Sequence, residues 1–216
     1  MTLLPPRDSS LRATVALLVA FLALFAASLL RAPASNSDLV LHHIPTVLFV
    51  AFLCWHGRTR RLDLHSYACI TIFLLIHVVG ARYTYSEVPY DAWTHALTGV
   101  TVSNTFDFQR NHYDRLVHFA FGALMLVPGS RLLAQRVTAA RADQVLLGIG
   151  LVVVAGAVYE LLEWAIAVSL SPTLADRYNG QQGDLWDAQK DQALNLAGAL
   201  VTAAMIASKW QLTRSR

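Results

Sequence analysis

The sequence VLLGIGLVVVAGAVYELLEWAIAVSL, residues 145–170, contains two acidic residues and no other charge. A hydrocarbon core about 30 Å thick is crossed by about 20 apolar residues in an α-helix, so this run is long enough to span a membrane. A carboxylate at the centre of such a helix costs roughly 2.5 to 3.5 kcal/mol. Glu160 and Glu163 therefore need polar partners from other parts of the chain, and those partners are candidates for a functional site.

The rest of the chain has the same apolar character. Of its 216 residues, 55% are hydrophobic and 14% are charged, whereas soluble domains carry about 25% charged residues. Strand-type alternation is absent, so we predict an all-α polytopic membrane protein, a six-transmembrane-helix bundle forming one membrane domain over residues 1–216. The predicted helices are 13–30, 39–55, 64–80, 113–133, 145–170 and 191–210.

The distribution of Lys and Arg predicts the orientation. The two ends of the chain and the turns near 56–63 and 130–143 hold 11 of the 17 basic residues, so the positive-inside rule predicts that both termini are cytoplasmic. A long outer loop then joins the third and fourth helices and includes an interfacial or re-entrant segment at about 93–106. The net charge of +3 follows from this topology and indicates no nucleic-acid partner. The first run also fits a cleaved signal peptide, so its retention is left open.

Polar residues in four predicted helices fall at one depth. At 1.5 Å per residue, Glu160 lies about 22 Å and Glu163 about 27 Å from the start of their helix, in the outer part of the bilayer. Spacings of three and four residues also place the polar groups of each helix on one face. Such groups are most easily buried against one another or around a water-filled cavity. The residues are His77, Asp114, His118, Glu160, Glu163, Asp187, Asp191 and Asn195.

These residues suggest roles in acid–base chemistry. Burial and like charge favour the protonated form of one glutamate, which then serves as a general acid. His118 is the candidate base, oriented by Asp114 or Asp191. The catalytic candidates are Asp114, His118, Glu160, Glu163 and Asp191. The substrate-binding candidates are His77, Arg82, Arg115, Asp187 and Asn195, with either arginine suited to a phosphate.

Plainer interpretations stay open for several of these residues. Asp187 and Asp191 also fit charges favoured at a helix N-terminus. Asp114 and Arg115 also fit an interfacial ion pair, and His77 also fits a packed histidine. The two glutamates also fit a structural hydrogen-bonded network. A cofactor is not identified, although carboxylates with histidine suit a divalent metal, either Mg or Mn, or Zn or Fe.

Three stretches carry a resemblance to a known family. NHYDRLVHFAFG (111–122), YELLEW (159–164) and GDLWDAQKDQALNLAGAL (183–200) resemble the YjdF-like family of bacterial inner-membrane proteins, whose function is unknown. A more distant similarity is to VanZ-like proteins of the cell envelope. The residues that match the VanZ-like pattern are Asp114, His118, Phe119, Glu160, Asp191, Asn195 and Gly198. Arg115 and Glu163 depart from it, because that pattern has Lys and Gln at these positions.

Three functions are consistent with the sequence. The first is an enzyme of the inner membrane that acts on an envelope lipid or lipid-linked substrate at the outer leaflet, by acid–base or metal-assisted chemistry. The second is a non-catalytic membrane scaffold or sensor. The third is a proton- or cation-coupled transporter, which the apolar inner half of every predicted helix disfavours. Membrane lipids are the expected partners, and the oligomeric state is not indicated.

Overall fold

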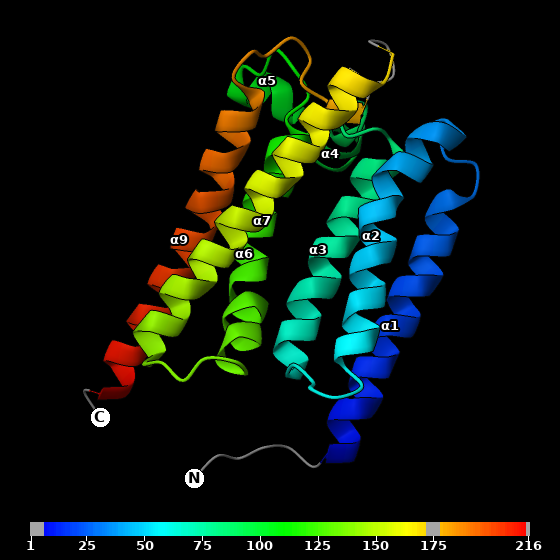
Figure 1. Cartoon of the computed structure of the whole chain (residues 1–216). Helices are drawn as coiled ribbons and strands as arrows, with labels where there is room; N and C mark the ends of the chain where they lie inside the picture. The colour runs from blue at the N-terminus through cyan, green and yellow to red at the C-terminus, as the bar shows by residue number, and fades with distance from the viewer. Residues whose placement is uncertain (1–6, 172–177, 215–216) are drawn as a thin grey trace.

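The computed structural model describes residues 7–171 and 178–214, and all the regular elements of that part are helices. The long helices pack side by side in a bundle, and two short helices lie at one end of it (Figure 1). The elements are α1 (Arg7–Leu29), α2 (Asn36–His56), α3 (Leu64–Arg82), α4 (Tyr90–Thr98), α5 (Val102–Phe106), α6 (Tyr113–Ala134), α7 (Arg141–Ser169) and α9 (Asp187–Arg214).

Each of the six predicted ranges overlaps one long helix. Among the described residues, α1, α2, α3, α6 and α7 are long and apolar enough to cross a membrane. The chain is thus a polytopic all-α membrane protein. The helix α9 has 28 residues but is not among these five, because charged and amide side chains fill its first two turns. Six crossings therefore remain a prediction.

Local sequence explains where the helices begin. Ser35 precedes α2, and its hydroxyl accepts a hydrogen bond from the backbone N–H of Asp38 at 3.2 Å. Asp63 precedes α3 and accepts from the backbone N–H of Ser66 at 2.8 Å. Both are side-chain caps that satisfy an amide lacking a partner within its helix.

Much of the apolar surface of the bundle is exposed. Along α7, Val154, Val158, Leu161 and Trp164 are each at least 59% exposed. Large contiguous apolar surfaces are rare on soluble monomers, but a membrane span presents such side chains to lipid. The opposite face of α7, at Gly148, Val152 and Gly156, is buried.

The helix α6 lies at the centre of the packing, in contact with α3, α7 and α9. A Cβ atom added at Gly122 of α6 would lie 1.9 Å from the carbonyl oxygen of Asn195 in α9. A Cβ atom added at Gly198 of α9 would lie 2.1 Å from the carbonyl oxygen of Phe119. Glycine is required at both positions, because the two backbones touch there, as small residues permit in membrane helices.

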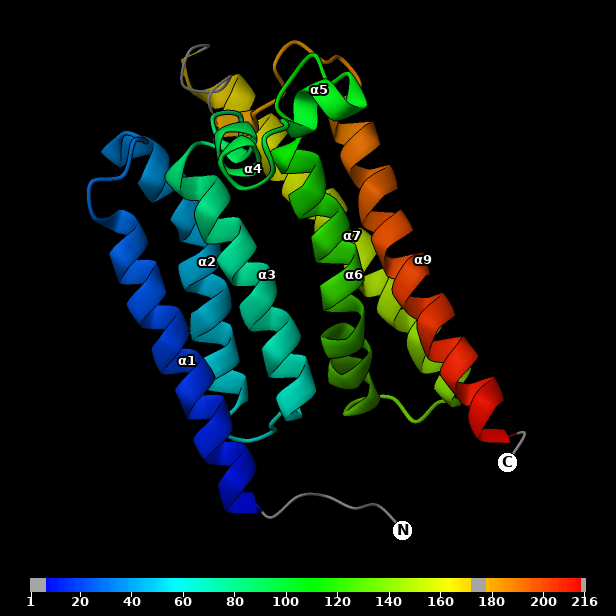
Figure 2. The ribbon, with the colours of Figure 1, turned by 180° about the vertical axis from the view of Figure 1, so that it is seen from behind.

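The two ends of the bundle differ in chemistry. The helix α1 begins and α9 ends at one end, which also holds the turns between α2 and α3 and between α6 and α7 (Figures 1 and 2). Arg131 pairs with Asp63 there at 2.6 Å. The short helices α4 and α5 lie at the opposite end and are joined by a hydrogen bond from the backbone N–H of Ser103 to Asp91 at 2.9 Å. With nine and five residues they are too short to cross a membrane.

Candidate functional site: a buried acid–histidine cluster

Four side chains from three helices meet near the end of the bundle that carries α4 and α5. We call Asp114, His118, Glu160 and Asp191 the acid–histidine cluster. The Nε2 atom of His118 lies 3.7 Å from Oδ1 of Asp114, one turn earlier in α6, and 3.7 Å from Oε1 of Glu160 in α7. Asp191 of α9 completes the group, because it offers a ligand atom within 4.8 Å of one from Asp114 and one from His118.

The acid–histidine cluster is shielded from solvent. Asp114 and His118 are each 7% exposed and Asp191 is 2% exposed. Two of its oxygens, Oε1 of Glu160 and Oδ1 of Asp191, accept no hydrogen bond from the described part of the chain. Buried acceptors are nearly always satisfied in folded proteins, so these two oxygens indicate that a proton, water or ligand belongs in the cluster.

Glu163 and Asn195 lie beside the cluster and play different structural parts. Asn195 is fully buried and donates from Nδ2 to the backbone oxygen of Val152 at 3.2 Å, which ties α9 to α7. Glu163 is one turn beyond Glu160 and partly buried. Its charge acts on Tyr178 and helps to raise the pKa of that residue.

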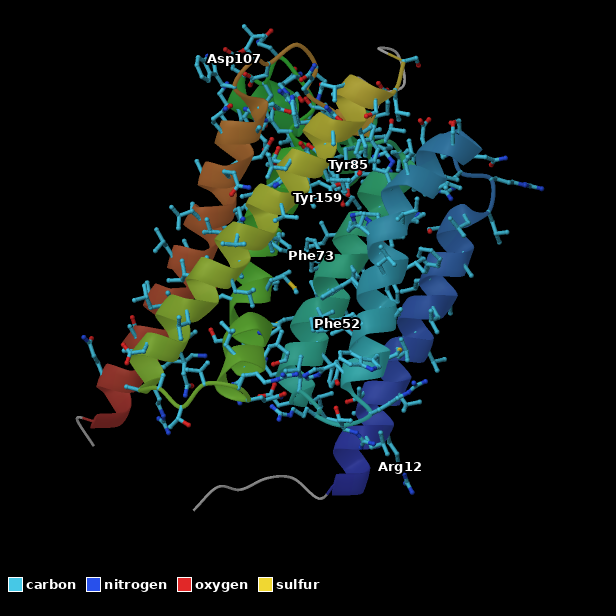
Figure 3. The ribbon with its side chains drawn as sticks, in the orientation of Figure 1. Arg12, Phe52, Phe73, Tyr85, Asp107 and Tyr159 are labelled. Atoms are coloured by element: carbon cyan, nitrogen blue, oxygen red, sulfur yellow. The ribbon has the colours of Figure 1, made fainter. Side chains whose placement is uncertain are left out.

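The cavity beside the cluster is apolar along most of its length. Its volume is about 380 Å³, within the roughly 300 to 1,000 Å³ of small-molecule sites. Side chains of α2, α3, α6 and α7 line it, among them Phe49, Phe52, Phe73, Phe121 and Met125. Figure 3 shows Phe52 and Phe73 along the bundle and Tyr85 and Tyr159 nearer the end with α4 and α5. Asp114 and His118 belong to the same lining, so a ligand in the cavity reaches the acid–histidine cluster.

A second polar group borders this cavity on α2 and α3. His77 accepts or donates at both ring nitrogens, to Thr46 at 2.7 Å and to the hydroxyl of Tyr85. His42 stacks on Tyr85 with ring centroids 5.3 Å apart and lies 4.7 Å from the ring of Tyr178. The structure therefore places His77 with these aromatic rings, across the cavity from the acid–histidine cluster.

The two tyrosines of this group lie outside the long helices and are held in the neutral form. Burial raises the pKa of Tyr178 to about 12, and Glu163 adds to the increase. Burial raises the pKa of Tyr85 well above its ordinary value, and the charge of Asp114 adds to the increase. Both therefore remain hydrogen-bond donors at neutral pH.

Charged residues form a cap over the cluster, and we call Arg110, Arg115, Asp184, Asp187 and Lys190 the charged cap. Arg110 pairs with Asp187 at 2.9 Å. Asp184 pairs with Arg115 and with Lys190. The hydrogen bond from Lys190, followed by those from the backbone of Trp186 and from Arg115, holds the pKa of Asp184 well below its usual range. Asp187 and Arg115 also pair with each other at 3.4 Å, so the ion pairs of both residues lie within the cap.

The structure does not bring Arg82 to the site. Its guanidinium donates to the backbone oxygens of Ser28, Leu30 and Arg31, at the carboxyl end of α1. Those carbonyls lack partners within their helix, and Arg82 satisfies them. A phosphate-binding role for Arg82 has no support in this arrangement.

Several residues of the site escape sequence reasoning. His42 and His43 lie in the second turn of α2. Their depth in the predicted helix would have identified them, as it did for the polar residues of the other helices. Arg110 and Asp184 lie in loops, where helical spacing gives no information about proximity. Tyr85 lies just after α3 and is 5% exposed, although its position alone suggests a surface loop.

A bundle of apolar helices with a buried acid–histidine cluster defines an integral membrane protein of the polytopic α-helical class. The chain belongs to the family described as "Predicted membrane protein (DUF2238)", whose model matches residues 13–211. It is 32% identical over 164 residues to the inner membrane protein YjdF of Escherichia coli strain K12, covering 76% of this chain and 74% of that protein. No solved structure matches the chain.

These matches confirm the YjdF-like resemblance and support a multi-pass protein of the inner membrane. The similarity to VanZ-like proteins and the role in the cell envelope stay predictions.

Proposed function

We propose that this protein is an enzyme of the inner membrane that acts on an envelope lipid or lipid-linked substrate at the outer leaflet. The observation that carries the proposal is the position of Asp114 and His118 in the wall of an apolar cavity. A hydrocarbon chain suits the aromatic and aliphatic lining, and its polar head then meets the acid–histidine cluster. Binding that holds a reacting group beside an acid–base pair is how enzymes convert affinity into rate.

The cluster supplies acid–base or metal-assisted chemistry at the head of the lipid. His118 serves as base or proton carrier between Asp114 and Glu160, and the second carboxylate stays ionised to orient it. Arg110, Arg115 and Lys190 outnumber the two acids of the charged cap, so the cap carries a net positive charge that favours an anionic headgroup. Arg110 joins Arg115 here as a candidate for phosphate binding.

The proposal includes six crossings with both termini in the cytoplasm. The helix α1 starts, and the helix α9 finishes, at the end of the bundle that is rich in Arg and Lys, which supports this orientation. The acid–histidine cluster then lies in the outer leaflet. Transport is less well supported, because the cavity lining away from the cluster is dominated by Phe, Leu and Met, where a relay needs polar groups.

A non-catalytic scaffold is the second candidate, and one observation favours it. The hydrogen bond from Asn195 to Val152, together with the contact at Gly122, shows that polar and small residues fix the packing of α6, α7 and α9. Loss of folded protein in cluster variants would point to this role.

Lipid turnover tests the enzyme proposal. The full-length protein is reconstituted in nanodiscs made from bacterial polar lipid extract, and all lipid species are followed by liquid chromatography and mass spectrometry. We expect the wild type to deplete one lipid class, and we expect His118→Ala and Glu160→Gln to lower the rate by about 10²- to 10⁴-fold. Asp143→Asn, an exposed acid at the start of α7, is the control and should retain the rate. Unchanged lipids with folded wild type, or turnover at the wild-type rate by both His118→Ala and Glu160→Gln, would overturn the proposal.

A further inference from the structure

The acid–histidine cluster contains more carboxyl groups than its one histidine can pair. Asp114, Glu160 and Asp191 face one imidazole, that of His118. The nearby arginines are engaged in the charged cap, where Arg110 binds Asp187 and Arg115 binds Asp184. Buried carboxylates are retained in proteins when they are paired, protonated or bound to a metal.

The distances within the cluster fit two ligands of one ion better than a hydrogen bond. His118 Nε2 lies 3.7 Å from Asp114 Oδ1, beyond the 2.7 to 3.2 Å usual for an N–H···O bond. Two ligands bound tetrahedrally at about 2.0 to 2.1 Å lie about 3.4 Å apart. Asp114, His118 and Asp191 each offer a ligand atom, all within 4.8 Å of one another.

The unsatisfied oxygen of Asp191 is independent evidence for a ligand. Asp191 is 2% exposed, and its Oδ1 accepts no hydrogen bond from residues 7–171 or 178–214. Leaving such an acceptor without a partner destabilises the folded protein, and does so more for a charged group. A cation coordinated beside His118 removes that cost without a proton donor.

We infer that Asp114, His118 and Asp191 bind a divalent transition-metal ion, Mn²⁺ or Zn²⁺, at the head of the cavity. Two carboxylates with one imidazole suit these ions, whereas Mg²⁺ and Ca²⁺ prefer oxygen ligands throughout. Glu160 lies beside the ion as a base. The role of the ion, though not its binding, rests on the proposed function: a bound ion acts as a Lewis acid toward the oxygen-rich head of a lipid.

Metal content tests the inference without any assay of turnover. The full-length protein in detergent is stripped with EDTA, incubated with MnCl₂ or ZnCl₂, desalted and measured by elemental mass spectrometry and by thermal melting. We expect the wild type to retain Mn²⁺ or Zn²⁺ in stoichiometric amount and to melt at a higher temperature. His118→Ala and Asp191→Asn should weaken binding by at least about tenfold. His65→Gln, at an exposed histidine near the start of α3 that does not line the cavity, should bind the ion as the wild type does.

The outcomes separate this inference from the proposed function. A folded wild type that retains neither ion and gains no thermal stability would overturn the metal site, as would wild-type affinity in both ligand variants. Lipid turnover by EDTA-stripped protein would overturn the Lewis-acid role of the ion while leaving the enzyme proposal intact. Retention of the ion without turnover in the nanodisc assay would support the site and contradict the enzyme proposal. The thermal shift of the wild type keeps the test decisive if a variant fails to fold.

Discussion

His118 is the residue on which the site depends, because it lies between Asp114 and Glu160 at equal distances of 3.7 Å. The two glutamates of YELLEW are not equivalent around it. Glu160 lies 3.7 Å from the histidine, whereas the charge of Glu163 helps to raise the pKa of Tyr178. A single turn of α7 therefore separates a residue in the cluster from one that borders the aromatic group.

Glu163→Gln is predicted to reduce lipid turnover less than Glu160→Gln, because it leaves the contacts of His118 in place. Gln is also the residue of the VanZ-like pattern at this position, so a functional variant supports shared chemistry between the two groups of proteins. Turnover of both variants in nanodiscs measures the difference. Equal loss in both would show that the second carboxylate is as necessary as the first.

At the scale of elements, the approach of α6 to α9 brings Asp114, His118 and Asp191 together. That approach requires glycine, since a Cβ atom at Gly122 would overlap the carbonyl oxygen of Asn195. Ion pairs then hold the start of both helices, between Arg110 and Arg115 on one side and Asp184 and Asp187 on the other. The position of the cluster therefore depends on helix packing and on the charged cap together.

Gly122→Ala is predicted to destabilise the folded protein by about 1 to 3 kcal/mol, the usual cost of an added group in a packed interior. Gly150→Ala is the matched control, because a Cβ atom there meets nothing within 4 Å. The control should be neutral or more stable by about 0.5 to 1 kcal/mol, as alanine is the better helix former. Thermal melts in detergent compare them, and equal stability of the two variants would contradict the close packing of α6 and α9.

Asp184→Asn is predicted to lower the melting temperature at pH 7, with a difference from wild type that shrinks in acid. The folded pKa of Asp184 lies below the unfolded value of about 3.9. Its stabilisation is therefore complete above that value and is lost as the pH falls through the folded pKa. Melting curves from pH 7 to strong acid measure the trend. A difference that stays constant below pH 4 would mean that the ionised carboxylate contributes nothing.

The helices could be predicted from the sequence because a long apolar run in a membrane must satisfy its own backbone hydrogen bonds, which an α-helix does. The grouping of Asp114, His118, Glu160 and Asp191 followed from depth and helical spacing. Arg82 could not be placed this way, since its partners are carbonyl oxygens at the end of α1, fifty residues and two helices away in the chain. Arg110 and Asp184 of the charged cap were missed as well, because they lie in loops that carry no periodicity.

The whole molecule is asymmetric along the bundle axis. The short helices α4 and α5 lie at one end, and the start of α1 and the end of α9 lie at the other (Figure 1). An apolar cavity lies between α2, α3, α6 and α7, and Asp114 and His118 of the acid–histidine cluster belong to its lining. This asymmetry suits chemistry on a lipid that enters from the bilayer, since the chain stays in hydrocarbon while the head reaches the polar groups.

Both termini are predicted to be cytoplasmic. A fluorescent-protein fusion at the carboxyl end should be bright and an alkaline-phosphatase fusion there inactive, whereas phosphatase inserted at Gly99, an exposed turn between α4 and α5, should be active. The opposite pattern would place the acid–histidine cluster in the inner leaflet.

Native mass spectrometry of the protein released from membranes tests most directly whether the cavity holds a lipid. Ala155 lines the cavity, so Ala155→Trp fills part of it, whereas the neighbouring Val154 is 59% exposed and outside it. We predict a bound lipid mass on the wild type and on Val154→Trp, and its loss from Ala155→Trp. A wild type free of lipid, or an Ala155→Trp variant that carries as much lipid as the wild type, would contradict the account.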